Sequence, residues 1–181
     1  MSALRADAAR SRARILQVAK SHRERPLRLN DIAREAGVGV GTAYRHFPTV
    51  HALIEALTLE TVERLLAVSR AAIEAEDAEA AFETCLRATV ELQLEDDGLQ
   101  VVLLAAHDEN EQLTIAKREL LANMTDVLRR AQAQGVVRGD LGVEQVMHLI
   151  CGIEHAIRLG VAADRALMLG VLLAGLQATG R

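Results

Sequence analysis

Two groups of side chains in this 181-residue chain have the types and spacing for metal or acid–base chemistry. His148, Cys151 and His155 lie at i, i+3 and i+7 of a predicted helix, so two imidazoles and a thiol share a stripe that suits zinc or copper. The alternative places this stripe in a core or a subunit interface, where cysteine packs as a small apolar residue. No fourth ligand is visible in the sequence, so we expect an interface and no metal.

The second group, His107, Asp108 and Glu109, has residue types that exchange protons or orient a ligand in a cavity. It follows a short apolar run, which favours a solvated helix end. The chain also has no phosphate-binding loop, no GxSxG motif and no dinucleotide fingerprint. We therefore expect no catalysis and no cofactor.

The third group suits nucleic acid: Thr42, Tyr44, Arg45 and His46 fall within five consecutive residues. Arginine can donate a pair of hydrogen bonds to guanine, threonine can contact a thymine methyl group, and tyrosine and histidine suit phosphate. Two apolar residues in the same stretch are four apart and share an inward face, which leaves the polar four pointing outward.

Two short helices joined by a tight turn are predicted to position these side chains. In LNDIAREAGVGVGTAYRHFP, apolar residues at helical spacing predict a helix over 29–36, and Gly37 ends it in a left-handed conformation. Val38 and Val40 are expected to pack the turn, and the glycines beside them to allow a close backbone approach. A second helix is expected over 42–47. This is the geometry of a helix-turn-helix, whose second helix enters the major groove of DNA.

The segment GVGVGTAYRHFP, preceded by LNDIAREA and followed by HALIEAL, resembles the DNA-binding signature of the TetR/AcrR family of bacterial transcriptional regulators. Near the carboxyl end, AQAQGVVRGDLGVEQV resembles the segment before the family's dimerisation helices, and VLLAGLQA is similar to the ending of the SbtR-like subgroup. The resemblance implies an all-α homodimer. Each subunit would have an N-terminal three-helix DNA-binding domain and a C-terminal helical domain that binds an inducer and dimerises.

The resemblance also implies the DNA contacts, with two departures from the family pattern. Arg28 and Val50 stand where the family usually has threonine and lysine, and we expect Arg28 and His51 to replace part of the usual phosphate contacts. The expected DNA-binding residues are Arg28, Thr42, Tyr44, Arg45, His46 and His51. A first helix over 6–21 adds Arg5, Arg10, Arg12 and Arg14, which can lie along the DNA backbone.

Composition and charge agree with a DNA-binding head on a helical body. Half of the residues are apolar and only two are proline, which favours an all-α fold. Residues 1–51 carry ten Lys and Arg against four Asp and Glu, whereas residues 52–181 carry eleven against twenty-one. We place the DNA-binding domain at 1–55 and the effector and dimerisation domain at 56–181, with a helix over 49–75 bridging them. No signal peptide, long apolar span or paired cysteine spacing is visible, so a cytoplasmic protein is expected.

Further helices are predicted over 78–95, 98–107, 110–134, 143–159 and 163–178. The last has almost no polar face, so part of its cover is expected from a second subunit. The expected dimer interface contains His148, Cys151, Gly152, His155, Leu169, Leu172, Leu173 and Leu176.

Helical spacing also suggests an aliphatic effector cavity, with an ordinary filled core as the alternative. Its expected wall contains Leu86, Val90, Leu103, Leu104, Leu121, Met124 and Leu128. The polar groups expected there are Cys85, Gln93 and His107, and Phe82 is the only aromatic residue of the second domain. The ligand-binding residues we single out are Cys85, Gln93, Leu103, His107 and Met124.

The function expected from these features is ligand-responsive repression from a palindromic operator, with half-sites about one helical turn apart. A helix-turn-helix regulator controlled by a protein partner, a metal-responsive regulator and a dimerisation protein with a vestigial head are the alternatives.

Overall fold

The computed structural model describes residues 2–22 and 26–178, and these are almost entirely helical. The helices are α1 (Ser2–Ser21), α2 (Leu29–Glu35), α3 (Val40–His46), α4 (Val50–Glu74), α5 (Ala78–Glu95), α6 (Asp97–Leu104), α7 (Glu111–Ala133), α8 (Val143–Leu159) and α9 (Arg165–Leu176). The expected all-α class is confirmed. None of the described helices is long and apolar enough to cross a lipid bilayer.

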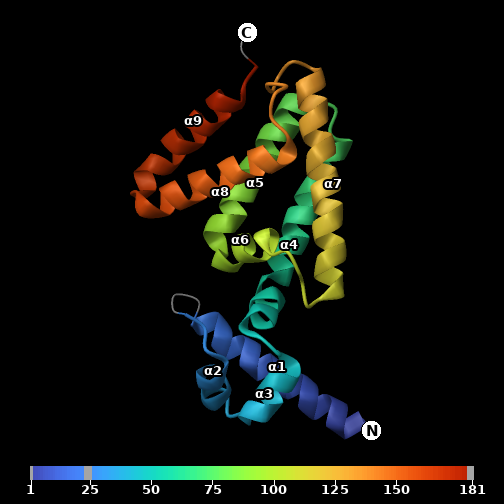
Figure 1. Ribbon diagram of the computed structural model, residues 1–181, viewed down its shortest axis with the longest axis vertical. Coiled ribbons are helices and arrows are strands. Elements are labelled where there is room, and N and C mark those ends of the chain that lie inside the picture. Colours follow the sequence, from blue (N-terminus) through green and yellow to red (C-terminus); the bar gives the residue numbers. More distant parts are fainter. Residues whose placement is uncertain (1, 23–25, 179–181) are drawn as a thin grey trace.

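Helices α1 to α3 and the first turns of α4 form a small head at one end of the molecule (Figure 1). They close around one apolar core that includes Ile15, Ile32, Phe47 and Leu57. Gly37 follows α2 with φ of +61°, so the predicted left-handed residue is confirmed.

The turn between α2 and α3 is shorter than predicted, because α3 begins at Val40 instead of Thr42. The carbonyl of Gly39 accepts hydrogen bonds from the backbone amides of Thr42, at 2.8 Å, and Ala43, at 3.0 Å. Gly41 therefore lies in the first turn of the helix, with open space where a Cβ would be, and Val40 is 42% exposed. The expected close approach at Gly41 and the packing role of Val40 were wrong, whereas Val38 is buried.

Helix α4 runs from the head into the body, which consists of α5 to α9 and the rest of α4 (Figure 1). The Thr49 side chain caps its amino end by accepting a hydrogen bond from the Ala52 amide at 3.0 Å. At the far end, the Arg130 guanidinium of α7 donates to the carbonyls of Ala72, Ile73 and Ala75. Both ends of α4 are thus held by side chains.

The body has two apolar cores on either side of α5. One lies among α5, α7, α8, α9 and the end of α4, and the other among α4, α6, α7 and the end of α5. Helix α6 ends at Leu104, three residues before the predicted end, and α9 starts at Arg165 because residues 162–164 form a 3-10 turn. A short bridge pairs Val137 with Gln177 and ties the end of α9 to the turn after α7.

Candidate DNA-binding surface and ligand cavity

The short helix α3 has one buried and one polar face. Ala43 and Phe47 are 0% and 2% exposed, so they anchor the helix in the head. The Arg12 guanidinium of α1 covers the ring of Phe47 at 5.2 Å from its centroid, which fixes α1 across the base of α3. Tyr44 and Arg45 are exposed, and the other two predicted side chains, at 42 and 46, are half-buried. All four lie on the outer face of α3.

The two further residues expected at the DNA surface lie in different surroundings. Arg28 is exposed just before α2; its carbonyl accepts a hydrogen bond from the Asp31 amide at 3.0 Å, and its side chain makes no capping hydrogen bond. His51 instead turns its Nε2 toward Glu55, 3.1 Å from Oε1 but not aligned for a hydrogen bond. Of these two side chains, only Arg28 presents its charged group to solvent.

The arginines expected along α1 are also divided. Arg10 forms an ion pair with Asp7, and Arg12 is committed to the Phe47 ring. The side chain of Arg5 lies outside the described residues. Arg14 is exposed and its guanidinium passes near Gly37, at the turn of the helix-turn-helix.

A polar joint links the head to the body. The Glu55 side chain is 1% exposed, and its two carboxylate oxygens accept hydrogen bonds from the backbone amides of Glu109, at 2.8 Å, and Asn110, at 3.0 Å. Thr49 donates to the side chain of Glu109 at 2.8 Å. The joint therefore holds the loop between α6 and α7 against the first turns of α4. Sequence reasoning missed Glu55, because its partners lie more than fifty residues away.

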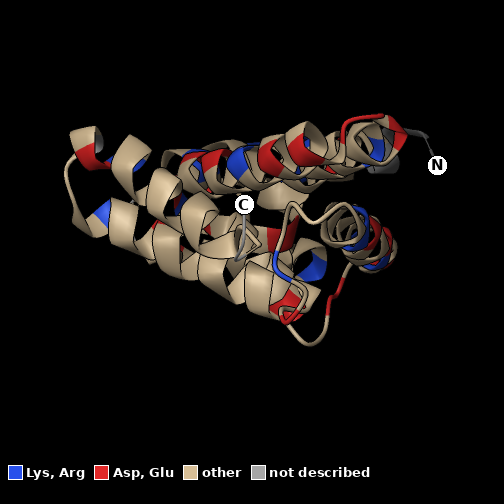
Figure 2. Ribbon diagram, turned by 90° about the horizontal axis from the view of Figure 1, so that it is seen from above, with Lys and Arg blue, Asp and Glu red and all other residues tan. Residues whose placement is uncertain are grey.

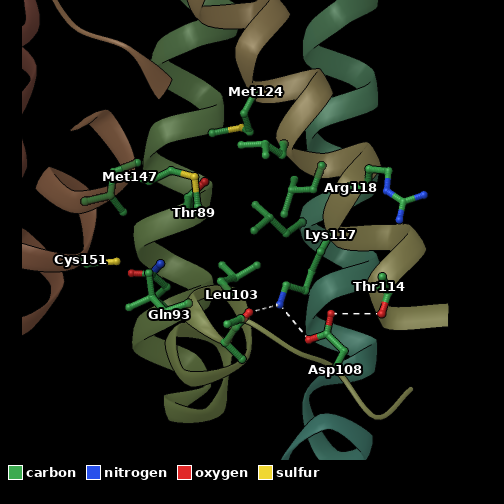
Figure 3. A pocket seen from close by; sticks show the side chains of 17 residues that line it. Thr89, Gln93, Leu103, Asp108, Thr114, Lys117, Arg118, Met124, Met147 and Cys151 are labelled. Atoms are coloured by element: carbon green, nitrogen blue, oxygen red, sulfur yellow. Dashed lines mark hydrogen bonds and ion pairs between the residues drawn. The ribbon is translucent and has the colours of Figure 1, made fainter. Parts of the chain in front are cut away.

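A cavity of about 320 Å³ opens in the body among α4, α5, α7, α8 and the end of α6 (Figure 3). Its polar wall includes Gln93 and Thr89 from α5, Cys151 from α8, and Lys117 from α7. The Lys117 Nζ donates to Asp108 Oδ1 at 2.8 Å, and Asp108 belongs to the loop that contacts α4. One wall of the cavity is thereby connected to the polar joint.

The expected ligand residues are divided between this cavity and its surroundings. Gln93, Leu103 and Met124 line it. Cys85 lies behind Met124, with 3.2 Å between the two sulfurs, and borders only a void of about 10 Å³. Burial raises the pKa of the Cys85 thiol to about 11. His107 is exposed and does not contribute to the wall.

The apolar wall agrees only in part with the expected set. Leu104 and Leu121 line the cavity, Val90 is fully buried in the core, and Leu86 and Leu128 border the small void beside Cys85. The filled-core alternative therefore applies to three of the expected apolar residues, while the open cavity is displaced toward the end of α6 and the first half of α7.

Comparison with known proteins assigns the chain to a family. A model of the C-terminal domain of SbtR-like transcriptional regulators matches residues 77–178, and a model of the tetR family of bacterial regulatory proteins matches residues 25–57. The chain belongs to the TetR family of transcriptional regulators. Comparison with curated proteins gave no match.

Solved structures of TetR-family proteins support the assignment. A TetR transcription regulatory protein from Mycobacterium vanbaalenii is 32% identical over 97% of this chain and 99% of its own, with a TM-score of 0.50. A TetR regulator from Streptomyces coelicolor is 28% identical over 93% and 99% of the two chains, with a TM-score of 0.55. The fold is also that of the regulator PfmR from Thermus thermophilus, at 21% identity, 93% and 96% coverage and a TM-score of 0.63.

The last two helices of this TetR-family chain present an apolar outer face. Leu159, Leu167 and Val171 are 77%, 68% and 61% exposed. Few charged residues lie on α8 and α9, which are mostly tan in Figure 2. His148, Gly152 and His155, three of the residues expected in the interface, are exposed on α8.

The other five residues expected in the interface are buried or half-buried within the subunit. Leu169, Leu172 and Leu176 are at most 5% exposed and pack into the subunit's own core, so they must be removed from the expected dimer face. The reason is that α9 lies against α8 and α5 within one subunit, which leaves only its opposite stripe free. Leu173 is half-buried against the same core, and Cys151 lines the cavity.

His148, Cys151 and His155 on α8 have the residue types of metal ligands, and the structure shows which such side chains lie close together. Within the described ranges, the group of three side chains whose ligand atoms lie within 4.8 Å of one another is His51, Glu55 and Asp108, not His148, Cys151 and His155. Both of its carboxylates already accept hydrogen bonds, Glu55 from two backbone amides and Asp108 from Lys117. These bonds explain the group as part of the polar joint.

Proposed function

We propose that this TetR-family chain is a ligand-responsive repressor that binds an inverted-repeat operator as a homodimer. The observation that carries the proposal is the outer face of α3, which presents four polar side chains while Ala43 and Phe47 on the inner face are buried in the head. A seven-residue helix held in this way presents its side chains as a rigid set, which is what base contacts in a major groove require.

The DNA contacts follow from exposure. Arg45 and Tyr44 are more exposed than the other two polar side chains of this face and are assigned to base edges and the adjacent phosphates. Thr42, His46 and Arg28 surround them and are assigned to the backbone. We assign no DNA contact to His51, because its Nε2 faces Glu55.

The second subunit is proposed to cover the outer stripe of α8 and α9. Leu159, Leu167 and Val171 form an apolar face on the body, and the family fold supports its use between two copies. His148, Gly152 and His155 extend the same face along α8. Two heads would then lie on one side of the dimer, so that each reads one half-site.

Effector control is proposed to act through the polar joint. A small molecule in the cavity contacts the wall that contains Lys117 and Asp108, and the Asp108 loop is bound to α4 through Glu55. Displacing this loop alters the place where the head meets the body. The open cavity favours a small molecule over a protein partner as the effector.

The proposal is tested by selecting genomic fragments with the purified protein at moderate salt and sequencing the bound pool. We expect enrichment of an inverted repeat, with affinity that falls steeply as salt rises. Arg45→Ala should weaken binding to that repeat by about 1 to 3 kcal/mol. Arg129→Ala, which removes an exposed arginine of α7, is the matched control and should bind like the wild type. A pool with no shared sequence, or equal selection by wild type and Arg45→Ala, contradicts the assignment.

A further inference from the structure

The wall of the cavity contains a polar atom that the protein itself does not satisfy. Gln93 is 3% exposed, and its Oε1 has no hydrogen-bond partner among the described residues. Its backbone carbonyl accepts a hydrogen bond from Arg158, so the position of the residue on α5 is held firmly. Because buried amide oxygens nearly always have a partner, this atom calls for a donor that comes from a bound molecule.

The other polar groups of the same wall are already engaged. The Lys117 Nζ donates to Asp108 Oδ1 at 2.8 Å and to the carbonyl of Ala105 at 2.9 Å. Thr114 donates to the other Asp108 oxygen at 3.2 Å, and Thr89 donates to a carbonyl of its own helix at 2.7 Å. The Lys117 charge is therefore balanced within the wall, which disfavours a second anion beside it.

Arg118 is the other cation among the described residues that line the cavity, and it does not change this balance. Its side chain is exposed, and Figure 3 shows the guanidinium extending away from the cavity. In the same view the Gln93 carboxamide and the Cys151 thiol lie on the opposite side, toward α8. Apart from the Cys151 thiol, a weak hydrogen-bonding group, the free hydrogen-bonding capacity of the described interior is thus concentrated at the uncharged Gln93 carboxamide.

The rest of the interior is aliphatic. The apolar side chains that line it are Leu65, Leu103, Leu104, Leu120, Leu121, Met124, Met147 and Ile150. None of the described lining residues is aromatic, so a planar ring or a quaternary ammonium group would find no ring to stack against. The volume of about 320 Å³ lies at the small end of ligand cavities.

We propose that the effector is a small, neutral, aliphatic molecule with one hydroxyl group, which donates a hydrogen bond to Oε1 of Gln93. The apolar body lies among the leucines and methionines, and the hydroxyl lies between α5 and α8. The inference rests on the proposed function only in treating this cavity as the effector site.

Three probes built on an eight-carbon chain test the chemistry: 1-octanol, its methyl ether and octanoate, each titrated into the purified protein by calorimetry. We expect 1-octanol to bind about tenfold more tightly than the ether, which lacks the donor. Octanoate should bind more weakly than 1-octanol, because Lys117 is already paired. The comparison in the wild-type protein needs no variant.

A variant then assigns the effect to one residue. Gln93→Leu should bind 1-octanol and the ether equally, whereas Gln112→Leu, which changes an exposed glutamine of α7, should keep the tenfold preference. Circular dichroism confirms that both variants fold. Equal binding of alcohol and ether by the wild type, tightest binding of octanoate, or no binding of any probe overturns the proposed ligand class. Operator selection uses no ligand, so its outcome is independent of these three results.

Discussion

Two residues of the same type can lie in very different surroundings, and the two cysteines of this chain do so. Cys85 and Cys151 are both unpaired thiols, yet Cys85 is 1% exposed and Cys151 lines the open cavity. Burial raises the pKa of Cys85 to about 11, which keeps its reactive thiolate form scarce at neutral pH.

We therefore expect alkylation of the native protein by iodoacetamide at pH 8 to modify Cys151 first, with Cys85 reacting only after denaturation. Mass spectrometry of tryptic peptides over time measures the two rates. The Cys151→Ala variant should show almost no labelling under native conditions. Faster labelling of Cys85 than of Cys151 would contradict the burial seen here.

Substitution by alanine is expected to affect stability differently at two glycines of the helix-turn-helix, Gly37 in the turn and Gly41 in α3. Gly37 has φ of +61°, where an L side chain is strained, so Gly37→Ala should lower the free energy of unfolding by about 1 kcal/mol. Gly41 lies in helix α3 with open space around a Cβ, so Gly41→Ala should be neutral or stabilising by up to about 1 kcal/mol. Urea unfolding of the two variants measures both values, and similar destabilisation by both would contradict the different roles.

At the scale of elements, the polar joint connects the loop after α6 to α4. Glu55 supplies two carboxylate oxygens that accept from the backbone amides of Glu109 and Asn110 just before α7, so losing the carboxylate leaves both amides without this partner. Helix termini need such acceptors, and here a side chain from another helix provides them.

We expect Glu55→Ala to lower the free energy of unfolding by about 2 to 4 kcal/mol, and Glu55→Gln, which keeps one acceptor oxygen, to lower it by less. Hydrogen exchange at the amides of Glu109 and Asn110 should accelerate in Glu55→Ala. Glu63→Ala removes an exposed carboxylate from the same helix and should leave both quantities unchanged. Unchanged exchange in Glu55→Ala would show that the joint does not hold the loop.

The helices themselves were largely predictable, because local signals mark their ends. The bounds of α4 and α5 agree within a residue, since Thr49 and Asp77 are side-chain caps visible in the sequence. The start of α3 was missed because Gly39 and Gly41 resemble turn residues, although Gly41 belongs to the first turn of the helix.

The candidate site was harder to predict. Helical spacing identified Gln93 and Met124, which share inward faces of α5 and α7. It did not identify Glu55 or the ion pair between Lys117 and Asp108. Both depend on how the loop between α6 and α7 is placed against α4. On α9, a sequence with a single polar residue, Arg165, gave no indication of which stripe faces the core, so the buried leucines were placed on the wrong side.

For the whole molecule, the decisive feature is the apolar outer face of α8 and α9. Leu167 and Val171 are exposed in one subunit on a helix with a single charged residue, Arg165. A face of this kind is stable in water when a second copy covers it.

We expect Leu167→Glu and Val171→Glu to convert a dimer to a monomer at micromolar concentration, because each buries a carboxylate in the proposed interface. Sedimentation velocity measures the mass. Ile115→Glu alters an equally exposed apolar residue of α7 and should leave the dimer intact. A wild-type protein that sediments as a monomer would contradict the proposed assembly.

The clamp that Arg130 places on the last carbonyls of α4 has a mechanical consequence. Because Arg130 holds the end of α4 that lies far from the head, a rotation of α4 about this end produces its largest displacement at the head. With that end held, a small displacement of α4 beside the Asp108 loop would be accompanied by a larger displacement of the head formed by α1 to α3. In Arg130→Ala this end of α4 loses its side-chain donor, so α4 would shift along its own axis instead of rotating about that end.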